Sequence, residues 1–221
     1  MLEESLPPLL ADPVAHIIRI LGTGVQRTLI ALAGLPGSGK STMAVSLTSR
    51  VDSIAGEGAM CAVSMDGFHL TRLDLAAMPD PAEALRRRGA PWTFDPAGMA
   101  EKLRLLRSSV GTVPVKWPDF QHGVGDHVPD AISIGPEARI VLVEGLYVAY
   151  NEGQWGHATE LFDERWFLDT SFEVSLERLT KRHMLTRHIS QEEAEIRISG
   201  NDKLNAELTY QTRHLCDWRV Q

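Results

Sequence analysis

Gly34-Leu35-Pro36-Gly37-Ser38-Gly39-Lys40-Ser41 is the stretch that decides the fold. It fits the pattern of a glycine, four residues, a glycine, a lysine and then serine or threonine, which wraps backbone N–H groups around a phosphate. The apolar run 28–33 precedes it, and helical spacing over 41–51 follows it. A buried strand, a glycine-rich loop and a helix in this order are the context in which such a loop binds nucleotide phosphates.

Each position of this loop has a predicted role. We expect Lys40 to bring its charge to the terminal phosphates and Ser41 to offer its hydroxyl to magnesium. The helix that starts at the loop adds the positive end of its dipole. The predicted nucleotide-binding residues are Gly34, Pro36, Gly37, Ser38, Gly39, Lys40, Ser41 and Thr42.

The pattern beyond the loop is that of an α/β protein. Short apolar runs at 59–65, 139–143 and 166–169 read as further buried strands, separated by helical stretches. These observations predict a three-layer αβα P-loop NTPase fold with a mostly parallel central sheet and a small lid. We expect one domain over 1–221, with an N-terminal helix in 1–24, a substrate-side insertion in 113–133 and a helical lid region in 174–200.

Several element boundaries can be read from local signals. Leu9 and Leu10 share helical spacing with later apolar residues, so they are expected in the N-terminal helix. Ser190 and Glu193 form a capping box for a helix that is predicted to close near Gly200. No secondary structure is predicted for the last stretch, 201–221.

Composition limits the function classes. The chain has 221 residues with 29 acidic and 22 basic side chains, a net charge of −7. A broad cationic surface for nucleic acid or anionic lipid is therefore not expected. Cys61 and Cys216 stand far apart and outside any metal-binding spacing. With no secretory leader or long apolar run either, we expect a cytoplasmic enzyme without nucleic-acid or membrane partners.

Two acidic residues follow predicted strands. Asp66 ends the second strand, at the sheet edge where open α/β folds bind ligands, and is a candidate general base. The alternative is a carboxylate that only caps the Asp-Gly turn. Glu144 ends the third strand after four aliphatic residues and is expected to border the substrate and to orient magnesium through water. The alternative is a solvated glutamate at a strand end.

Basic residues gather in two places. Arg178, Lys181 and Arg182 share a helical face, which fits a cationic lid over the phosphates or simple partners of the helix dipole. Arg86, Arg87 and Arg88 are adjacent, so they cannot all point the same way, and Arg88 is the candidate for substrate contact.

Histidines offer no metal-binding spacing. His69, His122 and His127 are scattered along the sequence, which favours hydrogen-bonding roles over metal ligation. His69 and His122 are the two expected at the substrate.

Two further strings carry a family resemblance. Asp66-Gly67-Phe68 and the stretch Arg87-Arg88-Gly89-Ala90-Pro91-Trp92-Thr93-Phe94-Asp95, in this order after the phosphate loop, resemble the superfamily of uridine kinase, phosphoribulokinase and type I pantothenate kinase. The resemblance runs from about residue 28 to 187, and strings around Glu144 and Gly200 resemble an uncharacterised kinase-like branch. It implies ATP and Mg²⁺ as cofactors and transfer of the γ-phosphate to a hydroxyl of a pantothenate-, sugar- or nucleoside-like metabolite.

The resemblance also implies roles for single residues. Asp66 becomes the base that accepts the substrate proton, and Arg178 and Arg182 become lid arginines at the transferring phosphoryl group. Pro118-Asp119-Phe120-Gln121-His122 matches a segment that borders the acceptor pocket, which implicates Asp119 and His122. By analogy adenine lies near the C-terminal segment, with Asn201 and Asn205 as candidates.

The acceptor stays open. Nucleoside kinases of the superfamily usually carry Asp-Ser-Phe-Tyr where this chain has Asp66-Gly67-Phe68-His69, which argues against a nucleoside. An alternative function is a regulatory protein that binds and hydrolyses ATP to change its affinity for a partner. A homodimer is compatible with either function.

Overall fold

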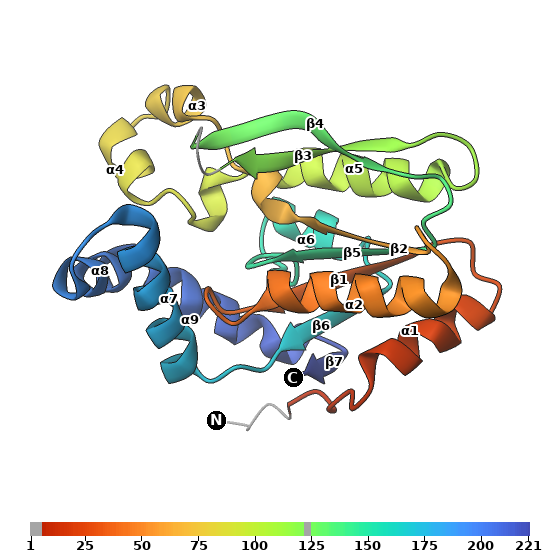
Figure 1. Cartoon of the computed structure of the whole chain (residues 1–221). Coiled ribbons are helices and arrows are strands. Elements are labelled where there is room, and N and C mark those ends of the chain that lie inside the picture. Colours follow the sequence, from red (N-terminus) through yellow and green to blue (C-terminus); the bar gives the residue numbers. More distant parts are fainter. Residues whose placement is uncertain (1–5, 122–124) are drawn as a thin grey trace.

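The strand sequences are short and apolar because the main sheet is buried on both faces. The computed structural model describes residues 6–121 and 125–221, and its main sheet has the strand order β2-β5-β1-β6-β7 with every pairing parallel. The predicted parallel α/β fold is confirmed (Figure 1). The strands are β1 (Thr28–Gly34), β2 (Met60–Ser64), β5 (Ile140–Gly145), β6 (Glu164–Leu168) and β7 (Trp218–Val220).

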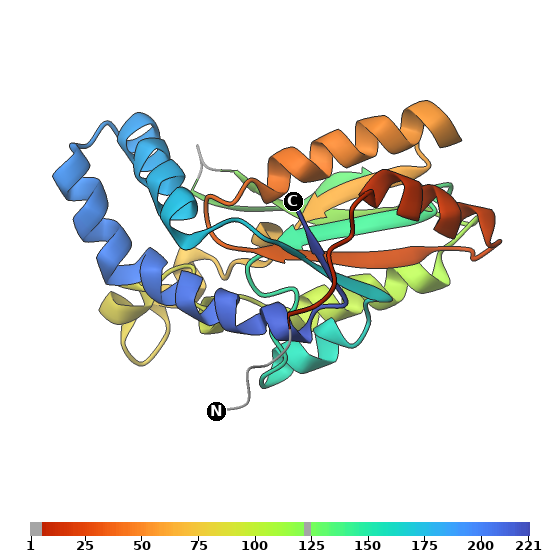
Figure 2. The same cartoon turned by 90° about the horizontal axis from the view of Figure 1, so that it is seen from below.

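Helices cover both faces of this sheet and make the three layers (Figures 1 and 2). The longer helices are α1 (Pro13–Gly22), α2 (Lys40–Ala55), α5 (Pro96–Ser108), α7 (Phe172–Arg187) and α9 (Lys203–Gln211). The shorter ones are α3 (Arg72–Ala76), α4 (Pro81–Arg86), α6 (Gln154–Thr159) and α8 (Gln191–Arg197). Single turns are η1 (Met65–Phe68), η2 (Pro91–Thr93), η3 (Ile198–Asp202) and η4 (Thr212–Leu215).

The central strand β1 shows how the two cores form. Successive side chains of a strand point to opposite faces. Leu29 and Ala31 therefore join the core under α5 and α6, whereas Ile30 and Leu32 join the core under α1 and α2. Because β1 lies between β5 and β6, its carboxyl end opens in the middle of the sheet edge, and the phosphate loop starts there.

The predicted insertion 113–133 coincides with an antiparallel hairpin. β3 (Val115–Gln121) pairs with β4 (Asp126–Ile134), with a bulge between Trp117 and Asp119. Trp117 is fully buried, and its indole nitrogen donates a 2.9 Å hydrogen bond to the carbonyl oxygen of Ser64. This bond fixes the hairpin over the end of β2, next to the turn that carries Asp66.

The N-terminal helix begins later than the sequence spacing predicted. Asp12 caps it and Pro13 opens it, because proline tolerates the first helical position. Leu9 and Leu10, expected in the helix, instead run beside the C-terminal strand, where the Leu10 amide donates to the Arg219 carbonyl at 2.7 Å. The prediction for these two residues was wrong because apolar spacing alone does not indicate that the helix begins at a proline.

The predicted stop near Gly200 is also wrong. The Ser190 capping box that starts α8 is present, but α8 continues through the π-helical turn η3 into α9. The unassigned stretch after residue 200 contains α9 and β7. Among the described residues, no helix combines the length and apolarity needed to cross a bilayer.

Candidate functional site

The phosphate loop connects β1 to α2, and two of its glycines are required by the backbone. Gly37 and Gly39 have φ angles of +83° and +102°, in the left-handed region that favours glycine. A Cβ on Gly37 would also run into the carbonyl oxygen of Ser175 on α7. The loop is therefore held against α7, and the glycines predicted there have a structural reason.

Lys40, the lysine of the loop, lies almost fully buried at the start of α2. Its Nζ donates hydrogen bonds of 2.9 Å to the carbonyl oxygens of Gly34 and Leu35. Burial lowers the pKa of this ammonium, while the carboxylates of Glu144 and Asp66 oppose that shift. The loop thus holds one cation close to two acidic side chains.

Glu144 and Ser41 meet across the edge of the sheet. Glu144 lies in β5 between Leu32 of β1 and Ser64 of β2, and its Oε1 accepts a 2.8 Å hydrogen bond from the Ser41 hydroxyl. Burial raises the pKa of Glu144, whereas Lys40 and the Ser41 hydrogen bond act in the opposite direction. The two residues assigned to magnesium are therefore in contact.

Asp66 lies just beyond the strand on which it was predicted. β2 ends at Ser64, and Asp66 sits in the turn η1, where its backbone N–H donates to the Ser64 hydroxyl at 3.1 Å. The prediction of a strand-terminal Asp66 was wrong by two residues, because Ser64 caps η1 and ends the strand. The carboxylate is still close enough to Lys40 and Glu144 to raise the pKa of both.

His69 lies at the end of the same turn. Its Nδ1 lies 2.8 Å from the Asp66 carbonyl oxygen, and its ring packs against Phe94 and Phe120 at centroid distances of 4.0 and 4.8 Å. Burial lowers the pKa of His69, although Asp66 partly opposes this. A neutral imidazole is suited to hydrogen bonding and not to pairing with an anion.

The hairpin brings Asp119 next to this turn. The close approach involves Gly67, because a Cβ there would overlap the carbonyl of Pro118, the residue before Asp119. Asp119 is half-buried and lies opposite Val128 in β4. His122 falls outside the described residues, and its role stays a prediction. His127 contacts the His69 carbonyl oxygen through Nδ1 at 2.9 Å.

The lid arginines lie beside the phosphate loop. Arg178 Nη1 donates to the carbonyl oxygen of Ser38 at 3.2 Å, and Arg182 is near enough to Lys40 to lower its pKa. Both arginines line a cleft of about 1040 Å³ together with Gly37 to Met43. Their placement fits the predicted role at the phosphates.

Sequence reasoning did not place several residues at this cleft, among them three polar ones from the end of β6 and the C-terminus. Asp169, Thr170 and Gln221 line it, and the Thr170 hydroxyl donates to the Ser38 carbonyl at 3.1 Å. Asp169 ends the fourth apolar run and Thr170 follows it, so their position at the carboxyl edge of the sheet was a usable signal. Gln221 had no such signal, because β7 itself was not predicted.

The adenine candidates Asn201 and Asn205 lie elsewhere. Asn201 Nδ2 donates to the Arg88 carbonyl at 3.0 Å, and Asn205 Oδ1 is 3.4 Å from Arg87 Nη2. Among the described residues that line the 1040 Å³ cleft, neither asparagine is present. The prediction that they contact adenine gains no support from this placement.

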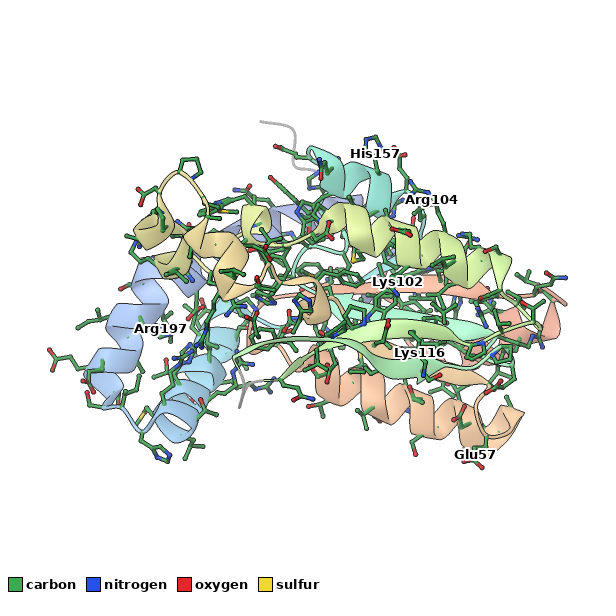
Figure 3. All side chains as sticks on the ribbon, turned by 90° about the horizontal axis from the view of Figure 1, so that it is seen from above. Glu57, Lys102, Arg104, Lys116, His157 and Arg197 are labelled. Carbon is green, nitrogen blue, oxygen red and sulfur yellow. The ribbon has the colours of Figure 1, made fainter. Side chains whose placement is uncertain are left out.

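A second cavity, of about 330 Å³, lies between the hairpin and α5. Lys102 on α5, visible beside the hairpin in Figure 3, lines it together with Asp95, Glu101 and Asp130. Lys102 pairs with Asp130 at 3.4 Å, so part of this charge is already compensated. Phosphate-loop residues do not contribute to its described lining.

Comparisons with known proteins agree with this geometry. The sequence profile of the phosphoribulokinase / uridine kinase family matches residues 29–202. An ATP-dependent kinase-like protein of Aspergillus versicolor is 42% identical over 146 residues, which are 65% of this chain and 85% of the relative. A Schizosaccharomyces pombe protein provisionally assigned as a uridine kinase is 36% identical over 181 residues, covering 81% of this chain and 77% of its own.

A solved structure is similar over nearly the whole chain. It comes from Silicibacter sp. TM1040 and is provisionally assigned as a fructose transport system kinase. The two share 29% identity and superpose with a TM-score of 0.80 over 96% of this chain and 100% of the other.

Proposed function

The chain belongs to the phosphoribulokinase / uridine kinase family, and from this premise we propose that it transfers the γ-phosphate of ATP to a hydroxyl group of a small metabolite. The observation that carries the proposal is the 2.8 Å contact of Ser41, from the phosphate loop, with Glu144 at the edge of the sheet, beside buried Lys40. Lys40 comes from the phosphate loop, Glu144 from β5 and Asp66 from η1, and they influence one another electrostatically. Phosphoryl transfer depends mainly on positioning and on charge compensation of this kind.

The phosphate loop would bind the donor. Its backbone N–H groups and the N-terminus of α2 would face the phosphates, and Lys40 would exchange its two carbonyl contacts for phosphate oxygens. The Ser38 hydroxyl, buried and without a hydrogen-bond partner among the described residues, is a further donor there. Arg178 and Arg182 would compensate the charge that spreads over the transferring phosphoryl group.

The residues present also fit magnesium. Ser41 and Glu144 offer a hydroxyl and a carboxylate oxygen in direct contact, and oxygen ligands are what this cation prefers. In the described part of the chain, no group of three histidine, cysteine or acidic side chains is arranged around a common point. Phosphate and water oxygens would complete the set. Bound magnesium supplies positive charge to the β- and γ-phosphates.

Asp66 would activate the acceptor. Within the described residues no hydrogen bond holds its carboxylate, so both oxygens are available to a substrate hydroxyl. Asp66 is close enough to Lys40 and Glu144 to act on the pKa of both, and η1 fixes its backbone beyond the end of β2. A general base must lie within hydrogen-bond reach of the proton that it accepts, and this position allows it.

The test combines product analysis with one substitution. Purified protein with labelled ATP and magnesium is offered pantothenate, sugars, glycerate and nucleosides, and phosphorylated product is scored. We expect Asp66→Asn to lower kcat by on the order of 100-fold or more while ATP affinity stays near normal.

Asp130→Asn is the matched control. Asp130 has a φ of +56°, which asparagine tolerates, and its carboxylate lies on the hairpin. Loss of ATP binding in Asp66→Asn would contradict the base assignment. ADP formation that no acceptor changes would instead favour an ATP-hydrolysing regulatory protein.

A further inference from the structure

Ser64, the last residue of β2, has contacts with three other elements. Its carbonyl oxygen accepts the 2.9 Å hydrogen bond from the Trp117 indole of the hairpin. Its hydroxyl accepts a 3.1 Å hydrogen bond from the backbone N–H of Asp66 in η1. In the sheet it is the register partner of Glu144 in β5. One half-buried serine therefore joins the hairpin, the turn of the proposed base and the strand of the proposed magnesium residue.

The Ser64 hydroxyl also donates to Glu144. A serine hydroxyl donates one proton and accepts through its lone pairs, and the Asp66 N–H uses only a lone pair. Residues paired in register on adjacent strands point to the same face of the sheet, which brings the hydroxyl beside the Glu144 carboxylate. Burial raises the pKa of Glu144, and hydrogen bonds from Ser41 and Ser64 oppose this shift. The carboxylate is thus held by one hydroxyl from α2 and one from β2.

The two hydroxyls that hold Glu144 have different further partners. The Ser41 oxygen is itself an expected magnesium ligand, so a bound cation would compete with its 2.8 Å contact to Glu144. The Ser64 oxygen is bonded instead to the backbone of η1, and its carbonyl is bonded to the hairpin. Ser64 is therefore the fixed partner of the carboxylate. Metal sites generally depend on such hydrogen bonds, which orient the ligating side chains from behind.

Capping of η1 explains only one of these contacts. Ser64 is the N-cap residue of this turn, and a cap needs an oxygen that accepts from a backbone N–H. It needs no proton to donate and no carboxylate beside it. The position opposite Glu144 adds the requirement for a donor on the same side chain, which serine and threonine meet and alanine does not. A role at Glu144 can therefore be tested by substitution of Ser64.

We propose that Ser64 is a positioning residue of the transfer site, whose hydroxyl orients the Glu144 carboxylate for magnesium and fixes the turn that carries Asp66. The inference rests on the proposed kinase function and adds to it a residue outside the phosphate loop. Because one oxygen serves both neighbours, the metal-binding carboxylate and the proposed base keep a constant relative position. Phosphoryl transfer requires this precision, since small displacements of the reacting groups reduce the rate steeply.

The first experiment measures metal binding without turnover. Mn²⁺, whose EPR signal reports the free cation, is titrated into the full chain with ADP kept below the protein concentration. We expect Ser64→Ala to weaken Mn²⁺ binding on the order of 10-fold, whereas Ser64→Thr keeps the hydroxyl and the wild-type affinity. Ser133→Ala, at an exposed position of β4, is the matched control and should follow the wild-type curve. Wild-type affinity in Ser64→Ala would overturn the inference.

A double variant tests whether Ser64 acts through Glu144. Ser64→Ala is combined with Glu144→Gln, and the same Mn²⁺ titration is repeated. We expect the double variant to bind Mn²⁺ about as weakly as Glu144→Gln alone, because the hydroxyl has no metal-binding carboxylate left to orient. Fully additive losses would show that Ser64 affects the metal independently of Glu144, and would overturn the inference.

Trp117→Phe separates positioning from a general loss of structure. This variant removes the indole donor at the Ser64 carbonyl and leaves the Ser64 hydroxyl in place. We expect Trp117→Phe and Ser64→Ala both to lower the thermal midpoint by several degrees, but only Ser64→Ala to weaken Mn²⁺ binding. Equal weakening in both variants would make the stability of this edge the cause, and would overturn the inference.

The link to Asp66 is tested by kinetics at saturating metal and ATP, with an acceptor that the wild type phosphorylates. We expect Ser64→Ala to lower kcat by about 10-fold or more, because η1 loses its cap, and Ser64→Thr to restore it. A wild-type kcat in Ser64→Ala would overturn the role at this turn. The Mn²⁺ experiments use no acceptor, so they decide the role at Glu144 even if no acceptor is phosphorylated, an outcome that would contradict the proposed kinase function alone.

Discussion

The phosphate loop, on the proposed donor side, and the turn η1 with its neighbours, on the proposed acceptor side, are built in different ways. Between β1 and α2, one continuous stretch supplies the backbone turn, the cation and the hydroxyl of the donor side. On the acceptor side, η1, the end of α4, the hairpin and the loop after β5 each bring one or two side chains. The first region is formed by residues close together in sequence. The second is formed by residues far apart in sequence, which come together only on folding.

This difference explains why the donor side is shared by a family and the acceptor side need not be. A local loop keeps its geometry wherever a strand precedes it and a helix follows it. The acceptor side depends on contacts between residues far apart in sequence, such as Trp117 with Ser64 and Asn205 with Arg87. Small changes in these contacts can alter the acceptor while leaving ATP binding intact.

The largest effect is expected from a substitution that disrupts the donor side alone. Lys40→Met removes the cation between the loop carbonyls and the two carboxylates, so charge compensation at the phosphates is lost. We expect kcat/KM to fall by at least about 100-fold with every acceptor and ATP affinity to fall with it. Radiolabelled ATP binding and product formation measure the two effects.

Lys102→Met is the control on the acceptor side. Lys102 lies at the hairpin cavity, so its replacement should leave ATP binding unchanged. An equal loss of ATP affinity in both variants would contradict the division of the site into two regions.

An intermediate effect is expected at Glu144. Glu144→Gln keeps the volume and the contact to Ser41 but removes the carboxylate, so the magnesium concentration for half-maximal activity should rise by about 10-fold. Titration of magnesium at fixed ATP measures this change. Glu101→Gln, on the exposed face of α5, is the control and should follow the wild-type curve. Coincident curves for all three proteins would contradict a role of Glu144 at the metal.

Local signals explain which parts of the fold and site could be predicted. The phosphate loop and the Ser190 capping box depend on residues a few positions apart, and both are where the sequence placed them. Glu144 lies in its predicted strand, because that strand is a continuous apolar run, and its role at the metal stays a prediction. β7 was missed, since three residues beside β6 carry no pattern of their own. The passage from α8 into α9 was missed because Gly200 looks like a stop but lies inside a π-helical turn.

The acceptor side was less predictable for a physical reason. Adjacency showed only that Arg86, Arg87 and Arg88 must diverge, and Arg88 was chosen for substrate contact. In the structure Arg88 donates hydrogen bonds to Asp126 and to two backbone carbonyls, so its direct contact with substrate stays a prediction. Which of the arginines pairs with a carboxylate depends on where Glu83 and Asp126 come to lie after folding. No local pattern contains that information.

The smallest expected effect concerns His69 and the pH dependence of stability. Burial lowers the pKa of His69 in the folded protein below its ordinary value of about 6.5, so the unfolded chain binds the proton more readily. Its contribution to stability is therefore complete above about pH 6.5 and is lost as the pH falls, by at most about 1.4 kcal/mol per pH unit. His69→Gln should show a smaller loss of unfolding free energy between about pH 7.5 and 5.5 than the wild type, measured by urea titration. His157 is exposed on α6 (Figure 3), so His157→Gln is the control and should lose as much unfolding free energy over this pH range as the wild type. The same pH dependence in all three proteins would show that folding does not lower the pKa of His69.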